Sequence, residues 1–505
     1  MKILLFFILV ITVFQLFPDE WNVSVSEDYL RITDSKIKDL DNDNIDEIVV
    51  SYFTSKGKFI DIYKSIKGEL VLIDKIKVPQ NTIFFDAGDL DNDNKADILF
   101  LTSYGIYFRE IENLFTKDNN DELTKEKYQN LIKENKNTNN SNFKIYENIY
   151  SEIVVSQPEL LKTVNMIIDL NGDGKNELII ENIRSIEVYE TKTFSIVDKI
   201  KLETILEFSM VPGQFYPQYI FYTLPIILVS DLDGDNKKEI ITKFPKSINI
   251  YGRGSSGKYE LKRVIKMGED NVYFLSNSFV KFSFPVITDI DNDNIKEIVV
   301  SSANLDMPKI KFEAIGDVYY FDKNKFVINK NKQIVLKGIP INLPYFLNIS
   351  DDKYKDFICP VIPFNLISIF GLLSGNGSVN VPFIYYTQDK EKFDMNRGKK
   401  LFEIPFRIEN ISSFVEELPF DSFKKGELPD FYYFQHNYKQ KIADITHYFY
   451  DDKKKSYQNI TITTLSLKNY TPELPSTLKL GNFSLHIKKD VLFITHKNLY
   501  LISRK

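Results

Sequence analysis

A nine-residue pattern rich in aspartate recurs five times in the chain. Each copy reads Asp-x-Asp/Asn-x-Asp-Asn/Gly-x-x-Asp/Glu, and the copies span residues 39–47, 89–97, 169–177, 231–239 and 289–297. Positions one, three, five and nine carry a side-chain oxygen in every copy. Oxygen ligands that alternate with other residues in so short a segment are typical of a loop that binds a divalent cation.

Calcium is the cation that this spacing predicts. Ca²⁺ prefers six to eight oxygen ligands, which a compact loop can supply from alternating side chains and one backbone carbonyl. Position seven is Ile or Lys, as expected if only its carbonyl is used, and position eight varies too freely to be a ligand. We therefore predict about five Ca²⁺ sites. The predicted ligands are Asp39, Asp41, Asp43, Ile45, Glu47, Asp89, Asp91, Asp93, Lys95, Asp97, Asp169, Asn171, Asp173, Lys175, Glu177, Asp231, Asp233, Asp235, Lys237, Glu239, Asp289, Asp291, Asp293, Ile295 and Glu297.

Two alternatives to this interpretation can be weighed from the residues. A helix-flanked calcium hand needs a Glu at position twelve, where the five copies carry Val50, Phe100, Ile180, Thr242 and Val300. Asp/Asn-rich turns without metal are the other alternative, since these residues favour turns for conformational reasons alone. Carboxylates so close together repel one another unless a cation is present, which favours metal in the five strong copies. Position six is always Asn or Gly, the residues that best tolerate a positive φ.

The segments around the loops predict β-structure. A short apolar run follows each copy, at residues 48–50, 98–100, 178–180, 240–241 and 298–300, and then a turn and another strand-like run. Each unit therefore reads as four short strands, with the acidic loop between the first and the second. Repeated four-stranded units without helical periodicity predict an all-β fold, a single β-propeller with radial blades.

The number of blades follows from counting copies. Degenerate copies begin at Asn348, Ser422 and Asn482, where most carboxylates are lost, and we expect turns that need no metal there. With the five strong copies they predict eight blades, although seven is common for this kind of repeat. The last copy is followed by only two strand-like runs, so Trp21–Val25 is predicted to supply the missing outer strand and close the ring.

Composition narrows the classes of function. The chain has 70 acidic and 64 basic residues, a formal charge of −6, so there is no basic excess to bind nucleic acid. Its single cysteine, Cys359, cannot form an intrachain disulfide. No Gly-rich phosphate loop and no Gly-x-Ser-x-Gly nucleophile motif is recognisable, and we do not expect an enzyme.

The first residues predict export from the cytoplasm. Residues 1–17 carry one Lys and then an apolar run that is shorter than a bilayer span, the pattern of a signal peptide. An uncleaved membrane anchor is the alternative, and it is the only membrane contact we expect. The protein is thus predicted to be secreted, or to lie in the periplasm or cell envelope. A polar segment at about residues 116–142 is predicted to be an insertion into the propeller, which otherwise spans residues 21–505.

The repeated loop with its following apolar strand resembles the FG-GAP and VCBS-type repeats of the integrin α-chain N-terminal propeller and of many bacterial exported proteins. The similarity covers residues 21–505 and is strongest up to about residue 300. It implies a calcium-binding propeller whose ligands are the loop residues named above, with adhesion or partner recognition as its role. The Phe-Gly and Gly-Ala-Pro segments of the integrin version are not recognisable, so the looser bacterial type fits better.

Two functions remain to be distinguished. The first is a noncatalytic, calcium-stabilised scaffold for binding, adhesion or envelope assembly, with an unidentified protein or carbohydrate as ligand. The second is a hydrolase or lyase acting on polysaccharide, with acidic residues of a central cleft as general acid and base. No carboxylate pair stands apart from the metal loops in the sequence, which favours the scaffold.

Overall fold

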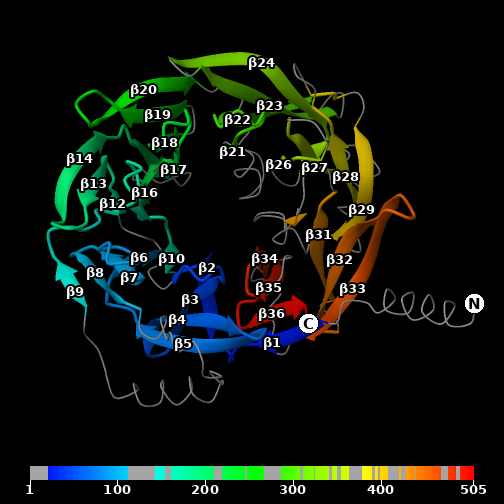
Figure 1. Cartoon of the computed structure of the whole chain (residues 1–505), viewed down its shortest axis with the longest axis horizontal. Helices are drawn as coiled ribbons and strands as arrows, with labels where there is room; N and C mark the ends of the chain where they lie inside the picture. The colour runs from blue at the N-terminus through cyan, green and yellow to red at the C-terminus, as the bar shows by residue number, and fades with distance from the viewer. Residues whose placement is uncertain are drawn as a thin grey trace, which may run out of the picture.

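Eight β-sheets follow one another around a ring in the computed structural model (Figure 1). The chain runs once round the ring, and every sheet uses consecutive strands except the last, which also contains the N-terminal strand. The structure describes residues 21–504 apart from 112–142, 154–160, 210–218, 224, 245–246, 267–285, 307–310, 323–324, 341–343, 350–353, 363–377, 389–392, 396–397, 408–419, 422–427, 438–439, 468–475 and 485–488. The predicted signal peptide and polar insertion lie outside the described residues.

The first four blades span the N-terminal half. Blade 1 contains β2 (Arg31–Lys38), β3 (Glu47–Thr54), β4 (Gly57–Ile66) and β5 (Glu69–Lys77). Blade 2 contains β6 (Thr82–Gly88), β7 (Asp97–Thr102), β8 (Ile106–Glu110) and β9 (Lys144–Tyr146). Blade 3 contains β11 (Ile167–Ile168), β12 (Glu177–Glu181), β13 (Ser185–Glu190) and β14 (Ser195–Lys201). Blade 4 contains β17 (Ile226–Ser230), β18 (Glu239–Phe244), β19 (Ser247–Arg253) and β20 (Tyr259–Lys266).

The remaining four blades complete the ring. Blade 5 contains β21 (Val286–Thr288), β22 (Glu297–Asp306), β23 (Lys311–Asp322) and β24 (Lys325–Lys337). Blade 6 contains β25 (Ile339–Pro340), β26 (Tyr345–Leu347), β27 (Asp356–Ile362), β28 (Ser378–Tyr386) and β29 (Lys399–Arg407). Blade 7 contains β30 (Phe420–Asp421), β31 (Asp430–Asn437), β32 (Ile442–Asp451) and β33 (Ser456–Ser466). Blade 8 contains β34 (Thr477–Gly481), β35 (Asp490–Ile494), β36 (Leu499–Arg504) and β1 (Trp21–Val25).

Three details depart from the predicted four-stranded repeat. A short strand, β10 (Lys162–Thr163), pairs in parallel with the first strand of blade 2 and makes that sheet five-stranded. In blade 6 both β25 and β26 pair with β27, so two short segments share the place of a first strand. Between blades 3 and 4 the chain forms a separate hairpin of β15 (Ile205–Ser209) and β16 (Tyr219–Thr223). No helix in the described residues is long and apolar enough to cross a membrane.

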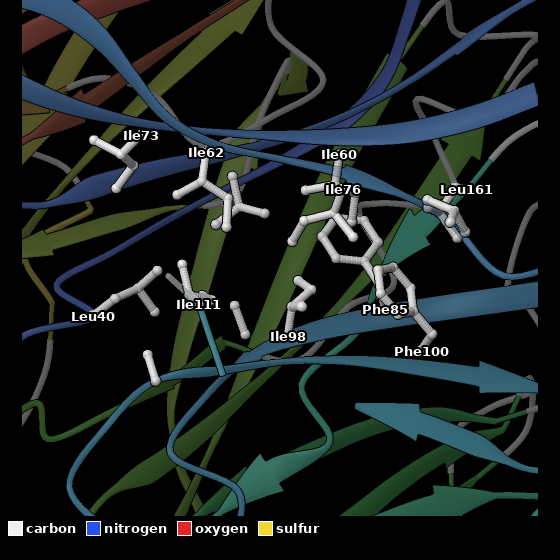
Figure 2. Close-up of a cluster of buried hydrophobic side chains, with 14 of the residues drawn as sticks. Leu40, Ile60, Ile62, Ile73, Ile76, Phe85, Ile98, Phe100, Ile111 and Leu161 are labelled. Carbon is white, nitrogen blue, oxygen red and sulfur yellow. The ribbon is translucent and has the colours of Figure 1, made fainter. Parts of the chain in front are cut away.

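The apolar runs after the acidic loops form strands that are buried on both faces. In β3, Ile48 and Val50 contact blade 8, while Val49 between them contacts blade 2, as the two-residue period of a strand requires. This explains why the runs are continuously apolar rather than alternating. Figure 2 shows the blade 1–blade 2 interface, where Ile60, Ile62, Ile73 and Ile76 face side chains of blade 2 such as Phe85, Ile98 and Phe100.

Each pair of neighbouring blades in the described structure encloses its own apolar cluster. The clusters lie between blades 1 and 2, 2 and 3, 3 and 4, 4 and 5, 5 and 6, 6 and 7, 7 and 8, and 8 and 1. The core is therefore a ring of separate interfaces rather than one central mass. Blade 8 contacts blade 1 through such a cluster, which confirms an eight-bladed, closed propeller.

The N-terminal strand closes the ring as the sequence predicted. β1 pairs antiparallel with β36, from Trp21 opposite Arg504 to Val25 opposite Tyr500. In Figure 1 the two ends of the colour scale, blue β1 and red β36, lie side by side. The segment after β1 adds a second connection, since the Tyr29 hydroxyl donates a hydrogen bond to Asp61 Oδ2 of blade 1 at 3.0 Å.

Candidate metal-binding loops

All eight copies of the pattern occupy the same place in their blades. Each lies between the first and the second strand, and its ninth residue is the first residue of the second strand. This holds for the five strong copies, as predicted; in the degenerate copies, residues 350–353, 422–427 and 485–488 lie outside the described residues, but the two flanking strands keep the same order. The ninth residues are Glu47, Asp97, Glu177, Glu239, Glu297, Asp356, Asp430 and Asp490.

The carboxylates at positions one and five fold each strong loop onto itself. Asp39 accepts hydrogen bonds from the Asp43 N–H at 3.2 Å and from the Asn44 N–H at 2.9 Å. Asp43 in turn accepts one from the Ile45 N–H at 2.8 Å. The other four strong loops repeat both features, with the position-four N–H taking the place of position five in blades 3 and 4. These bonds wrap the backbone so that oxygens converge.

The carboxylate at position nine ties the end of the loop to its start. In every strong copy it accepts a hydrogen bond from the N–H of position two, at 2.7–3.0 Å. These carboxylates are buried, and burial raises the pKa of Glu239 and of Glu297 to about 8. For Glu47 and Asp97, burial raises the pKa to about 7. Position nine therefore has a structural role besides the predicted one of ligand.

Two residues in each strong loop adopt the left-handed conformation. Position six does so in all five copies, with φ between 66° and 82°, as the sequence predicted. Position four does so as well, at Asn42, Asn92, Gly172, Gly234 and Asn292. The residue types at position four already indicated a positive φ, because this position too is always Asn or Gly, but our prediction did not use them.

Neighbouring loops are joined by hydrogen bonds, and we call this series of contacts the loop belt. The N–H of position eight donates to the position-two carbonyl of the preceding blade in three cases: Lys238 to Leu170 at 2.9 Å, Lys296 to Leu232 at 3.0 Å, and Lys355 to Ile290 at 2.7 Å. Between blades 8 and 1, Asp46 N–H donates to the Asn482 carbonyl at 2.8 Å. Position eight can vary because these contacts use its backbone N–H, although the Asp46 side chain adds one by accepting a hydrogen bond from the Asn482 N–H at 2.7 Å.

The loop belt uses side chains between blades 2 and 3. Asn92 Oδ1 accepts a hydrogen bond from the Asn176 N–H at 2.7 Å, and the Asn176 amide donates to the Asp89 carbonyl at 2.7 Å. Asn92 is a left-handed position-four residue and Asn176 is at position eight. The conformation of one acidic loop is thereby coupled to that of the next.

The loops of blades 1, 2, 4 and 5 bring three carboxylates close enough to share one ion. Their ligand atoms lie within 4.8 Å of one another in the groups Asp39/Asp41/Asp43, Asp89/Asp91/Asp97, Asp231/Asp233/Glu239 and Asp289/Asp291/Glu297. In blade 2, Asp91 Oδ1 is buried and has no hydrogen-bond partner among the described residues. An unsatisfied buried carboxylate oxygen is costly, and a cation would stabilise it. The residues of the blade 2, 4 and 5 loops fit the predicted calcium ion, whereas in blade 1 a lysine ammonium already lies among the carboxylates.

The blade 3 loop differs because position three is an amide. Asn171 donates a hydrogen bond from its side-chain nitrogen to Glu177, and its side-chain oxygen accepts one from the Asp173 N–H at 2.8 Å. The amide thus donates a hydrogen bond to a Glu177 oxygen, which an ionised Asp at this position could not do. The charge of this loop comes from Asp169, Asp173 and Glu177.

Lysine side chains contact two of the loops in different ways. Lys64 of β4 places its ammonium in the blade 1 loop, 2.5 Å from Asp41 Oδ2, 2.7 Å from Asp43 Oδ2 and 3.3 Å from Glu47 Oε1. Burial alone would lower the Lys64 pKa, but the hydrogen bonds to Asp41 and Asp43 outweigh it and raise the pKa. Lys144 makes one contact with the blade 2 loop, at 2.6 Å from Asp91 Oδ2, and its side chain is 60% exposed.

Position seven contributes its backbone to the fold of the loop. Its N–H donates to the position-five carboxylate in every strong copy, which leaves its carbonyl for the predicted ligand role. The Lys95 and Lys237 side chains at this position extend toward solvent and are about half exposed. Ile295 at the same position is instead buried in the cluster between blades 4 and 5, so the surroundings of the position-seven side chain differ between blades.

A cavity away from the loops was not predicted. It has a volume of about 630 Å³ and is lined by first and second strands of blades 2 to 5, with Glu181 as the acidic residue among the described lining. Burial raises the pKa of Glu181 to about 7, and its Oε1 has no hydrogen-bond partner among the described residues. Cys359 is fully buried, as expected for an inert thiol.

The architecture defines the chain as an eight-bladed β-propeller. No family model and no curated protein matches the sequence. Among solved structures, BBS1N in complex with ARL6DN, soaked with mercury, is similar at 10% identity over 90% of this chain and 100% of that chain, with a TM-score of 0.35. A protein from Lactobacillus plantarum is similar at 11% identity over 88% of this chain and 96% of that chain, with a TM-score of 0.30.

Proposed function

We propose that this protein is an exported, calcium-stabilised β-propeller of the FG-GAP/VCBS type that acts as a noncatalytic scaffold for binding or adhesion. The observation that carries the proposal is the repeated acidic loop with converging carboxylates, held at the same place in successive blades. Ca²⁺ suits this ligand set because it prefers hard oxygen donors from flexible loops.

The loop belt gives the ion a structural purpose. Bound calcium would neutralise carboxylates that otherwise repel one another, and would hold positions four and eight against the neighbouring blade. With a single buried thiol, the chain cannot use disulfides to brace a fold outside the cytoplasm. Calcium in the loops would supply that brace instead.

The face opposite the loop belt is the surface that we assign to the partner. Neighbouring strands of a blade run antiparallel, so the loops between first and second strands lie on one face, and the blade-to-blade connections lie on the other. Three large apolar side chains on this second face are exposed: Leu30, Tyr104 and Tyr150. Exposed aromatic and aliphatic side chains in loops favour a protein or carbohydrate ligand.

A polysaccharide hydrolase or lyase is supported by one feature, the half-buried Glu181 in the cavity. A carboxyl with a pKa of about 7 could act as a general acid. Glycoside hydrolysis commonly needs a second carboxylate some 5–10 Å away. The described lining of the cavity offers none. The scaffold is therefore the function that the geometry supports best.

Thermal unfolding with saturating Ca²⁺ and with EDTA tests the proposed function, together with metal content by elemental analysis. An ion that binds only the folded state raises its stability, by about 3 kcal/mol at a hundredfold excess over the dissociation constant. We expect a higher melting temperature with Ca²⁺ and several ions per chain. Equal melting temperatures and no bound metal would show that the loops are acidic turns.

Export is tested separately by cell fractionation and mass spectrometry of the N-terminus. We expect the protein outside the cytoplasm and without residues 1–17. Recovery in the membrane fraction with Met1 intact would instead identify the segment as an anchor, and recovery of the intact chain in the cytoplasm would contradict export.

A further inference from the structure

The blade 1 loop differs from the other strong loops in what lies at its centre. Its carboxylates surround the Lys64 ammonium, which lies within 3.3 Å of Asp41, Asp43 and Glu47. The Lys64 side chain is only 12% exposed, Asp41 is 7% exposed and Glu47 is fully buried. An ammonium so enclosed places one positive charge among the oxygens that are predicted to bind Ca²⁺, and among these Asp41 Oδ1 and Glu47 Oε1 accept no hydrogen bond from the described residues.

The register of the blade explains why the lysine reaches this place. Lys64 follows Tyr63, which pairs with Ile48, so it lies opposite the position-nine residue Glu47 on the neighbouring strand. A lysine here can extend its side chain directly toward the loop. The strand thus holds the stem of the lysine while the carboxylates hold its ammonium.

The other strong blades have no cation at this register position. Glu110 lies opposite Asp97 in blade 2, and Glu190 lies opposite Glu177 in blade 3. In blade 4 the register places Gly252 opposite Glu239, and in blade 5 it places Tyr320 opposite Glu297. A Cβ added at Gly252 would lie 3.5 Å from Glu239 Oε1, which confirms that this position adjoins the position-nine carboxylate.

The lysine and a calcium ion cannot both occupy the blade 1 loop. The ammonium contacts Asp41, Asp43 and Glu47, three of the five predicted ligands of that loop, and like charges at ligand distance repel strongly. For Ca²⁺ to enter, Lys64 would have to leave an enclosed, triply paired position. The donor set therefore fits an internal ammonium and does not fit the metal.

We propose that Lys64 is the resident cation of the blade 1 loop and that this loop closes without a metal ion, while the other strong loops take Ca²⁺. The blade that adjoins the N-terminal closure would then remain braced when calcium is scarce. The expected numbers of bound ions rest on the proposed calcium function. The role of Lys64 as an internal counter-ion does not.

Metal stoichiometry of Lys64→Met tests the proposal. Methionine keeps an unbranched stem of similar length but removes the charge. After dialysis against Ca²⁺, we expect about four ions per chain in the wild type and about five in Lys64→Met. Lys144→Met is the matched control, since Lys144 also contacts a loop carboxylate but is mostly exposed, and we expect about four ions there. The double variant Lys64→Met/Asp41→Asn should lose the additional ion.

Unfolding in EDTA supplies a readout that does not depend on calcium binding. Without metal, Lys64→Met should have a lower melting temperature than both the wild type and Lys144→Met, because Asp41, Asp43 and Glu47 lose their counter-ion. With Ca²⁺ the difference should shrink.

Equal ion counts of about five in the wild type and Lys64→Met would overturn the proposal, since Lys64 would then not exclude metal. An unchanged melting temperature of Lys64→Met in EDTA would overturn it too. If no variant binds calcium, but Lys64→Met alone is destabilised, the proposed calcium function fails while the internal counter-ion is supported.

Discussion

At the scale of single residues, the loops depend on backbone conformations that few residues can adopt. Positions four and six are both left-handed, yet they differ in surroundings. Gly172 at position four lies against the neighbouring blade, where an added Cβ would be 2.2 Å from the Asn236 carbonyl oxygen. Gly174 at position six has nothing within 4 Å of an added Cβ. Glycine is therefore favoured at position six by the backbone conformation alone, and at position four also by the close contact with the next blade.

Replacing each glycine by alanine separates these constraints. Gly174→Ala should destabilise the fold by about 1 kcal/mol, the usual cost of a left-handed alanine. Gly172→Ala should cost about 3 kcal/mol or more, because the loop belt must also move to relieve the clash. Urea denaturation in EDTA measures both without a contribution from bound calcium. Equal losses in the two variants would show that the contact between loops is loose.

Glu181 gives the protein a predicted pH dependence. Its pKa is raised by burial to about 7 from an ordinary 4.5, so the folded state binds its proton more tightly than the unfolded state does. Glu181 therefore lowers the free energy of unfolding. This loss is absent below about pH 4.5, grows as pH rises toward 7, and is constant above that. Glu181→Gln should therefore stabilise the protein at pH 8 by roughly 2 kcal/mol and have little effect at pH 4.5. Unfolding at the two pH values checks this, and equal effects at both would contradict it.

At the scale of elements, the N-terminal strand β1 contacts blade 7 besides completing blade 8. Trp21 of β1 packs edge-on against Tyr432 of blade 7, with ring centroids 6.4 Å apart. The Arg504 guanidinium of β36 lies 4.9 Å from the centre of the Trp21 ring. Blade 7 is thus in contact with a residue whose strand belongs to blade 8, and Trp21 joins the two blades.

Truncation of this side chain should loosen the closure. Trp21→Ala is expected to destabilise the fold by about 2–3 kcal/mol, somewhat less than a fully buried tryptophan, because the ring is half-buried. Val25→Ala in the same strand is the matched control, since Val25 is 50% exposed, and should cost under about 0.5 kcal/mol. Chemical denaturation measures both. Similar small losses would mean that the backbone pairing of β1 alone closes the ring.

At the scale of the whole molecule, the blades differ in how they are braced. The strong loops lie in blades 1 to 5, where the position-nine carboxylate accepts a hydrogen bond from the position-two N–H, whereas in blades 6 and 8 it accepts hydrogen bonds from other groups of the protein. Asp356 accepts hydrogen bonds from the Gln388 N–H at 2.9 Å and the Tyr385 hydroxyl at 3.1 Å. Asp490 accepts one from the Ser484 hydroxyl at 2.6 Å. Blades 6 and 8 thus stabilise this carboxylate with hydrogen bonds, whereas the loops of blades 1, 2, 4 and 5 bring several carboxylates together.

Hydrogen exchange should reveal this division. If the strong loops bind calcium as proposed, addition of EDTA should speed amide exchange at the start of β12, β18 and β22, each of which begins with a predicted position-nine ligand. Exchange in β32, β35 and β36 should change little, because no strong loop precedes these strands. Mass spectrometry of peptides that cover each strand makes the comparison. Uniform acceleration around the ring would indicate that calcium stabilises the propeller only as a cooperative whole.

The sequence by itself determined the repeat and the strand that follows each loop, and it favoured eight blades over seven, a choice that the structure settled. It could do so because conformation and burial are local constraints: a tight turn needs Asn or Gly, and a strand buried on both faces must be apolar throughout. The place of β1 could also be predicted, since the last unit lacked a strand and the chain had one to spare at its start.

Only the tertiary structure decided which contacts the loops make. Nothing in the spacing of the five copies indicates that position eight bonds to the preceding blade, since a backbone N–H leaves no trace in residue type. Lys64 is seventeen residues after Glu47, in a different strand, and only the register of β3 and β4 brings its ammonium to the loop. Neighbours in space are set by strand pairing and ring closure, so five loops that look alike in sequence are not alike in charge.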